Sequence, residues 1–131
     1  MPALATLLFG AALMQEKSNL SAAYDACMAR AGGVTVEIRT CTSQERGRQD
    51  SRLNATYREL MRGLPEDRRA GLRDAQRAWI AFREAECNYR GEQEGGGTLQ
   101  AVIIDSCWLS FTAERADQLQ HALEFEREYG E

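Results

Sequence analysis

Cysteine is the residue type with the greatest chemical scope in this sequence, and its spacing limits what that chemistry is. The chain has four cysteines, Cys27, Cys41, Cys87 and Cys107, and one histidine. A zinc site needs four thiolate or imidazole ligands that usually arrive in close pairs, but the sequence has no CxxC motif. The cysteines therefore predict disulfides in an exported protein, with no metal and no cofactor.

Four cysteines allow three pairings, and the sequence alone does not choose among them. Chain order favours Cys27–Cys41, which would join two helices across Gly32-Gly33, and Cys87–Cys107, which would close a glycine-rich loop. By loop-closure entropy each bridge would contribute about 3 kcal/mol, a large share of the stability of a small domain. We expect the role of these bridges to be structural.

Catalytic groups are not evident in the sequence. His121 lies among polar residues near the end of a helical segment, where we expect a solvated side chain, and no nucleophile elbow is present. Two carboxylates can hydrolyse a glycoside when burial raises the pKa of one of them. However, Glu84, Glu86, Glu92 and Glu94 are not placed in an apolar pocket by their neighbours. We predict no catalytic residue and no enzymatic activity.

Gln76 and Arg83 are seven residues apart and therefore lie on one side of a helix, near Trp79 and Phe82. A guanidinium in that position can stack on an aromatic ring or pair with an acid of a neighbouring helix. We interpret Gln76 and Arg83 as a structural polar seam between helices.

The hydrophobic periodicity predicts four helices, at about residues 18–31, 37–63, 65–90 and 99–128. Gly32-Gly33 ends the first, Val34-Thr35-Val36 forms a connector, and Pro65 suits the first turn of the third. Residues 91–97 are expected to be the most exposed and mobile loop, because glycine loses much backbone entropy in a helix. The predicted fold class is all-α, a small antiparallel bundle of about four helices stapled by two disulfides. The second and third helices are expected to pair.

Apolar residues at helical spacing define the faces that should point inward. They are Leu53, Tyr57, Leu60, Met61 and Leu64 in the second helix, Leu72, Ala75, Ala78 or Trp79, Phe82 and Cys87 in the third, and Val102, Ile103, Cys107 or Trp108, Phe111, Leu119 and Leu123 in the fourth.

The N-terminal residues 1–14 are expected to be a signal-peptide remnant or an apolar segment, and residues 15–131 the helical domain. Residues 3–13 have the length of a signal-peptide apolar region and are too short to span a bilayer. No Lys or Arg precedes them, so an apolar helix packed on the domain is the alternative. The surroundings of Cys27 do not resemble a lipoprotein acylation site, and we expect no stable membrane insertion.

Charge is distributed unevenly along the chain. Residues 15–83 carry Lys17 and twelve arginines against nine acids, whereas residues 84–131 carry three arginines against eleven acids. An acidic C-terminal part disfavours nucleic acid as a partner and would attract a cationic protein, an effect that salt weakens. The alternative is a solvated surface of mixed charge.

Several motifs together resemble one known family. LNATYREL at residues 53–60, LRDAQRAWIAFREAEC at 72–87, GGGT at 95–98, Cys107 and TAERADQL at 112–119 resemble the lysozyme inhibitor LprI-like domain family. The resemblance covers nearly all of residues 20–123. It implies a periplasmic or secreted helical domain that binds a cationic lysozyme. The founding type is a lipoprotein, and its membrane attachment does not carry over to this chain.

If the family activity holds, the expected partner is a lysozyme or another secreted cationic protein, bound by a monomer or weak dimer. The expected interface is the glycine loop with Glu92 and Glu94, together with Asp105, braced by the Cys87–Cys107 bridge. A braced loop loses less entropy on binding. The alternative function is an envelope interaction module, such as an immunity or scaffold protein, whose partner is another secreted protein.

Overall fold

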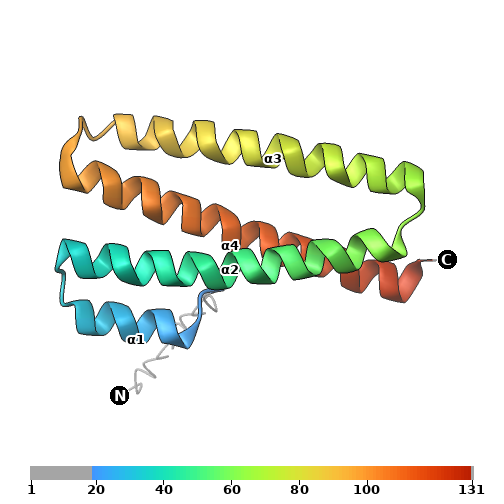
Figure 1. The fold of residues 1–131 in the computed structure, drawn as a ribbon, viewed down its shortest axis with the longest axis horizontal. Helices are drawn as coiled ribbons and strands as arrows, with labels where there is room; N and C mark the ends of the chain where they lie inside the picture. Colours follow the sequence, from blue (N-terminus) through green and yellow to red (C-terminus); the bar gives the residue numbers. More distant parts are fainter. Residues whose placement is uncertain (1–18, 131) are drawn as a thin grey trace, which may run out of the picture.

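The computed structural model describes residues 19–130, and all of the regular structure in that range is helical. The helices are α1 (Ala22–Ala31), α2 (Thr35–Gly63), α3 (Glu66–Glu92) and α4 (Gly97–Tyr129) (Figure 1). The predicted all-α fold with two disulfides is thus confirmed. The N-terminal segment expected at residues 1–14 lies outside the described residues, so its assignment stays a prediction.

Helix α1 has clear signals at both ends. The hydroxyl of Ser21 accepts a hydrogen bond from the backbone N–H of Tyr24 at 3.1 Å, which caps the first turn. Gly32 ends the helix with a φ of 57°, a left-handed conformation in which glycine avoids the strain of a side chain. The predicted end of this helix at Gly32 is confirmed.

Helix α2 begins two residues earlier than expected. Val34 is the extended residue that precedes the helix, and Thr35 is the first helical residue, so Val34-Thr35-Val36 is not a connector. The N–H of Ile38 donates to the carbonyl of Val34 at 2.9 Å and closes the first turn. The weak helix propensity of β-branched residues is a small penalty that this turn overcomes.

Helix α3 also continues further than expected, through Gly91, and the turn to α4 comprises residues 93–96. A Cβ atom at position 91 would lie 2.5 Å from Cγ1 of Ile104, so glycine here lets α3 approach α4 closely. The turn itself uses Gly95 and Gly96, whose φ values are 73° and 103°. Gly91 is therefore a packing glycine rather than a loop glycine.

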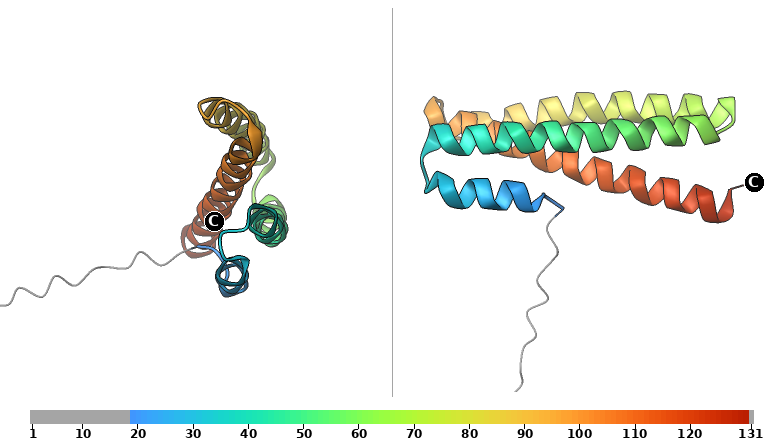
Figure 2. Two further views of the ribbon diagram at one scale, coloured as in Figure 1. Left: turned by 90° about the vertical axis from the view of Figure 1, so that its left-hand side faces the viewer. Right: turned by 60° about the horizontal axis from the view of Figure 1, so that its bottom comes forward.

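Helix α4 is the central element of the fold. It packs against both α2 and α3, and α1 packs against α2 (Figures 1 and 2). Helices α2 and α3 run antiparallel across the short turn at Leu64 and Pro65, but α3 packs along α4 instead of α2, contrary to our expectation. The reason is that α4 is buried on two sides and supplies most of the core cluster.

The core is built mainly from α2 and α4. Leucines of the two helices surround the fully buried Ala116, and Tyr57, Leu72 and Trp79 pack against this cluster. The buried residues of the cluster are Leu53, Leu60, Ala116, Leu119 and Leu123. The predicted inward positions of these leucines are confirmed. In α4, however, the predicted Val102, Ile103 and Phe111 are only half-buried, and Leu109 is buried although it was not predicted.

The predicted inward face of α3 is only partly correct. Within α3 only Cys87 and Gly91 are buried, and Leu72 and Trp79 are half-buried. Phe82 is 57% exposed and meets the ring of Phe111 edge-on at 5.7 Å between centroids. Because α3 has one packing neighbour instead of two, the wide apolar stripe of its sequence is only partly covered.

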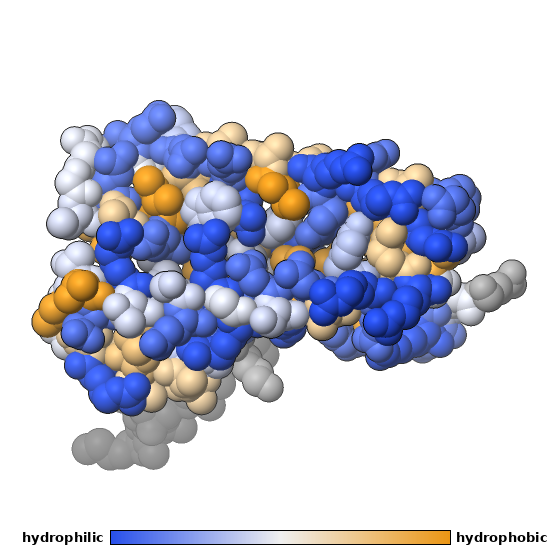
Figure 3. Space-filling view, viewed as in Figure 1, coloured by the Kyte–Doolittle hydropathy of each residue, from blue (hydrophilic) through white to orange (hydrophobic). Residues whose placement is uncertain are grey.

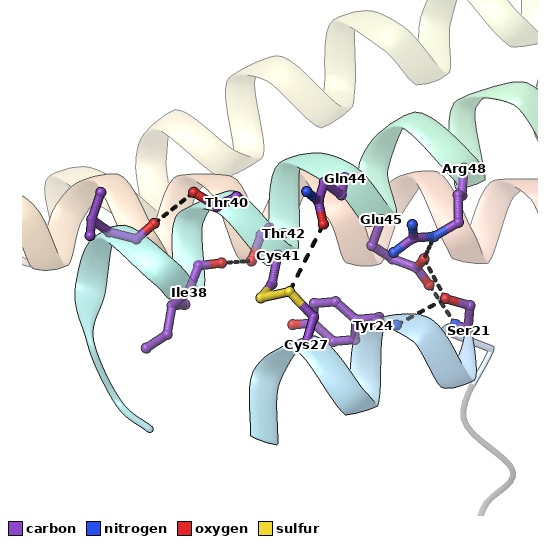
Figure 4. Close-up of a disulfide and its surroundings, with 11 residues drawn as sticks. Ser21, Tyr24, Cys27, Ile38, Thr40, Cys41, Thr42, Gln44, Glu45 and Arg48 are labelled. Carbon is purple, nitrogen blue, oxygen red and sulfur yellow. Dashed lines mark hydrogen bonds and ion pairs between the residues drawn. A yellow bond between two sulfur atoms is a disulfide. The ribbon is translucent and has the colours of Figure 1, made fainter. Parts of the chain in front are cut away.

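Both disulfides have the pairing that chain order favoured. Cys27 is bonded to Cys41, which joins α1 to α2, and Cys87 is bonded to Cys107, which joins α3 to α4. Figure 4 shows the first bridge between the two helices, next to Tyr24. Each bridge therefore links two helices that follow one another in the chain.

Candidate docking surface

The connection between α1 and α2 and the turn between α3 and α4 lie at the same end of the molecule, on the left in Figure 1. We call this the loop end, and define it by residues 32–36 and 89–99. It carries four apolar side chains that are each more than half exposed, namely Val34, Val36, Tyr89 and Leu99. Figure 3 shows a hydrophobic patch at its lower left, where α1 and α2 connect. Exposed apolar groups beside charged ones are typical of surfaces that bind another protein.

The loop end is also the braced part of the molecule. Cys41 lies near the start of α2, and Cys87 lies near the end of α3, so both bridges are close to the loop end. The opposite end, with the turn at Leu64 and Pro65, has no disulfide among the described residues. The bridges therefore limit the conformational freedom that the helices beside the loop end lose on binding.

The three acidic residues predicted to bind a partner differ in their surroundings. Glu92 is the last residue of α3 and Glu94 lies in the turn, and both are exposed, with no side-chain hydrogen bond or ion pair among residues 19–130. Asp105 lies in α4, where its carboxylate accepts from Nε of Arg39 at 2.7 Å and is 28% exposed. Within residues 19–130, Asp105 shares no hydrogen-bond or ion-pair partner with Glu92 or Glu94.

Ion pairs between helices cancel part of the charge asymmetry seen along the chain. Arginines of α2 and α3 hold acids of α4, through Arg39–Asp105, Arg52–Asp117 and Arg68–Glu126. These acidic residues of α4 are therefore partly neutralised by arginines of α2 and α3. Glu92 and Glu94 are acids that this pairing leaves free.

Gln76 and Arg83 both lie between α3 and α4. The amide oxygen of Gln76 accepts from Nε of Arg115 at 2.9 Å, and Nη1 of Arg83 donates to Oγ1 of Thr112 at 3.1 Å. Both side chains therefore make a hydrogen bond from α3 to α4.

The sequence did not reveal that Arg83 shares an aromatic ring with an arginine of α2. The guanidinium carbon of Arg83 is 4.0 Å from the ring centroid of Trp108 and 4.5 Å from that of Trp79. The guanidinium of Arg46 lies over the same Trp108 ring at 4.4 Å. No local spacing connects Arg46 to Trp108, because the two residues are on different helices far apart in the chain.

Glu45 is a second residue that sequence analysis missed. Its side chain is fully buried, and its carboxylate accepts from the backbone N–H and the hydroxyl of Ser21, from Nε of Arg48 and from Nε2 of Gln49. Figure 4 shows this carboxylate at the start of α1. Burial raises the pKa of Glu45, but the hydrogen bonds outweigh burial and hold that pKa below 4.5. Glu45 thus fixes α1 on α2.

Side chains that bind metals are not gathered into a site within residues 19–130. His121 is exposed, and no group of three or more His, Cys, Asp or Glu side chains there is arranged to hold a metal ion. No helix in the described part of the chain is long and apolar enough to cross a membrane.

Together these features define a class of protein, a small helical domain whose two disulfide-linked helix pairs present a braced surface. A family model described as Lysozyme inhibitor LprI matches residues 27–119. The chain belongs to this family. The match begins at Cys27 in α1 and ends in α4, so it includes all four cysteines and both braced connections.

Two curated relatives resemble the chain. Uncharacterized protein R02472 of Rhizobium meliloti (strain 1021) is 26% identical over 102 residues, which cover 68% of this chain and 73% of the relative. Uncharacterized protein YecT of Escherichia coli (strain K12) is 33% identical over 98 residues, covering 63% of this chain and 60% of the relative. No solved structure matches the chain.

Proposed function

We propose that this chain is an extracytoplasmic protein-binding domain that inhibits a lysozyme-type muramidase by direct docking, without catalysis or a cofactor. The observation that carries this proposal is the Lysozyme inhibitor LprI match, which spans both disulfide-linked helix pairs. The two disulfides support a periplasmic or secreted location, since such bonds persist in oxidising compartments.

The proposed docking surface is the loop end. A muramidase with a basic surface would meet the free carboxylates of Glu92 and Glu94, while Val36 and Leu99 supply exposed apolar area. Complementary charge speeds the encounter, and apolar contacts set the rate of dissociation. Asp105 supports this surface indirectly, because its carboxylate already holds Arg39.

The first test is a cell-wall turbidity assay with several lysozymes at low and high salt. We expect the purified chain to slow lysis, and to do so less at high salt, because screening weakens attraction between exposed charges. The chain alone should not clear the cell walls; clearance by the chain would identify a hydrolase. If no lysozyme is inhibited while the chain captures a defined envelope protein, the alternative of an envelope interaction module replaces this proposal.

The second test locates the surface. We expect the double variant Glu92→Gln/Glu94→Gln to bind the inhibited muramidase about 3- to 10-fold more weakly at low salt, because each exposed ion pair contributes little. Glu114→Gln/Glu128→Gln is the matched control, since it removes the same charge from two exposed acids elsewhere. Equal affinities for the two double variants would exclude the loop-end acids from the interface.

A further inference from the structure

Arg46 of α2 and Arg83 of α3 form an unusual pair of cations against Trp108 of α4. Both guanidinium groups lie over the ring of Trp108, at 4.4 and 4.0 Å from its centroid, although like charges repel at short range. In Figure 3 the surface between α3 and α2 mixes polar, intermediate and hydrophobic side chains. We call Arg46, Arg83, Trp79 and Trp108 the arginine–tryptophan cluster.

The cluster lacks a carboxylate partner. Eight other arginines of the described chain form ion pairs with Asp or Glu, but neither Arg46 nor Arg83 does. Asp50 and Glu84 act on Arg83 only through space, and Arg46 opposes them. Burial is the main reason that the pKa of Arg83 lies below its ordinary value; Arg46 lowers it further, whereas Asp50 and Glu84 raise it. Neither guanidinium therefore has a carboxylate in direct contact within residues 19–130.

Hydrogen-bond donors in the cluster also remain free. A guanidinium has five N–H groups in its plane, and stacking on tryptophan covers only its faces. Arg83 uses Nη1 to donate to Thr112, while its Nε is buried and has no partner among the described residues. Arg46 makes no side-chain hydrogen bond there. The N–H groups of the half-buried Arg46 match a carboxylate of a partner, whereas the buried Nε of Arg83 is out of its reach, so Arg83 contributes its charge.

The cluster is open to a partner. Arg46, Arg83, Trp79 and Trp108 are all half-buried rather than enclosed. Arg46 also lines a hollow of about 400 Å³ that runs along α2 toward Val36 at the loop end, past Arg39 and Asp105. The cluster and the loop end are thus connected by one continuous stretch of surface.

We propose that Arg46 and Arg83 receive a catalytic carboxylate of the muramidase, an inference that rests on the proposed function. Enzymes that hydrolyse glycosides carry two carboxylates across the bond that they cleave, so their clefts are acidic even when the rest of the surface is basic. The free acids of the loop end then meet the basic rim of the enzyme, while the arginines occupy the acidic cleft. Substrate is excluded because its binding cleft is filled.

A double-mutant cycle tests this contact by calorimetric titration, which does not depend on enzyme activity. One protein is the full chain carrying Arg46→Gln. The control carries Arg58→Gln, because Arg58 is exposed, lies on the same helix and has no ion pair within residues 19–130. The other is the inhibited muramidase, unaltered or with its catalytic carboxylates changed to amides. We expect Arg46→Gln to weaken binding to the unaltered enzyme about 10-fold or more, and Arg58→Gln less than about 2-fold.

The amide form of the enzyme gives the decisive comparison. We expect Arg46→Gln to have little further effect on binding to that form, because the partner of the arginine has lost its charge. A loss of the same size on both enzymes, or equal affinities of Arg46→Gln and Arg58→Gln, would overturn the contact while leaving the proposed function in place. If the unaltered chain binds no muramidase, both proposals fail. Unchanged thermal melts of the two variants would show that the fold is intact.

Discussion

At the scale of single residues, the most consequential side chain outside the proposed interface is Glu45. It lies in the middle of a strongly polar stretch of α2, where an acid is ordinarily solvated, yet it is 0% exposed. Its partner Ser21 is 24 positions earlier in the chain, so no local pattern could reveal the contact. By contrast, the common side of Gln76 and Arg83 was predictable, because a seven-residue spacing fixes it within one helix.

We predict that Glu45→Gln lowers the free energy of unfolding by about 1–3 kcal/mol, because an amide nitrogen would face donors that now lack an acceptor. Urea denaturation measures this, and Glu114→Gln, at an exposed position, should change stability by less than about 0.5 kcal/mol. Equal stability of the two variants would mean that the buried carboxylate does not anchor α1.

The same residue sets a pH dependence. Because the folded-state pKa of Glu45 is below 4.5, its stabilisation is complete above that pH and is lost as pH falls through the folded-state pKa. Hydrogen bonds from Arg73 and Arg68 also lower the pKa of Glu66 and Glu126, but those groups remain in the variant. We therefore expect the difference in stability between the unaltered chain and Glu45→Gln to shrink in acid. A difference that is constant with pH would contradict this.

At the scale of elements, helix positions were predictable because apolar periodicity and capping residues are local signals. The errors occurred where two helices meet. Gly91 was expected in a loop because glycine disfavours helix, but its backbone approach to Ile104 is a property of the α3–α4 contact. The outward position of Phe82 has the same origin, since the sequence of α3 does not reveal how many neighbours the helix has.

We predict opposite effects of the same substitution at two glycines of α3. Gly91→Ala should destabilise the fold by about 1–3 kcal/mol, because the new methyl group would collide with Ile104. Gly71→Ala should stabilise it by about 0.5–1 kcal/mol, because position 71 is exposed, helical and free of neighbours. Thermal melts of both variants test this, and two changes of the same sign would contradict the packing of α3 on α4.

At the scale of the whole molecule, two disulfides support the fold. The Cys87–Cys107 bridge matters most for α3, because only two residues of that helix are buried. The existence of such bridges was predictable from the cysteine count, and chain order favoured the pairing that the structure has without excluding the other two. The α2–α4 core and the arginine–tryptophan cluster were not, since both arise from helices brought together by folding. The family resemblance indicated the helical fold. It could not indicate the residues that contact a partner, because these depend on which surface remains exposed after the helices pack.

We predict that removing each bridge has a different result. Cys27→Ser/Cys41→Ser and Cys87→Ser/Cys107→Ser should each lower stability by about 3 kcal/mol, since they open loops of 14 and 20 residues. Only the second pair should also weaken muramidase binding clearly, because it releases the turn that carries Glu94. Melts with and without reductant measure the first effect. Melts that do not respond to reductant would contradict a structural role of the bridges.

The pairing of the bridges within neighbouring helices has one more consequence. No bond between sulfur atoms crosses from α1 and α2 to α3 and α4, so the peptide backbone at Leu64 and Pro65 is the one covalent link between the two halves of the described chain. Proteolytic nicking at this point would yield two closed fragments, held to each other by the apolar seam of α2 and α4 and by ion pairs such as Arg39–Asp105 and Arg52–Asp117. The native domain could then be assembled from two separately prepared polypeptides, each oxidised on its own.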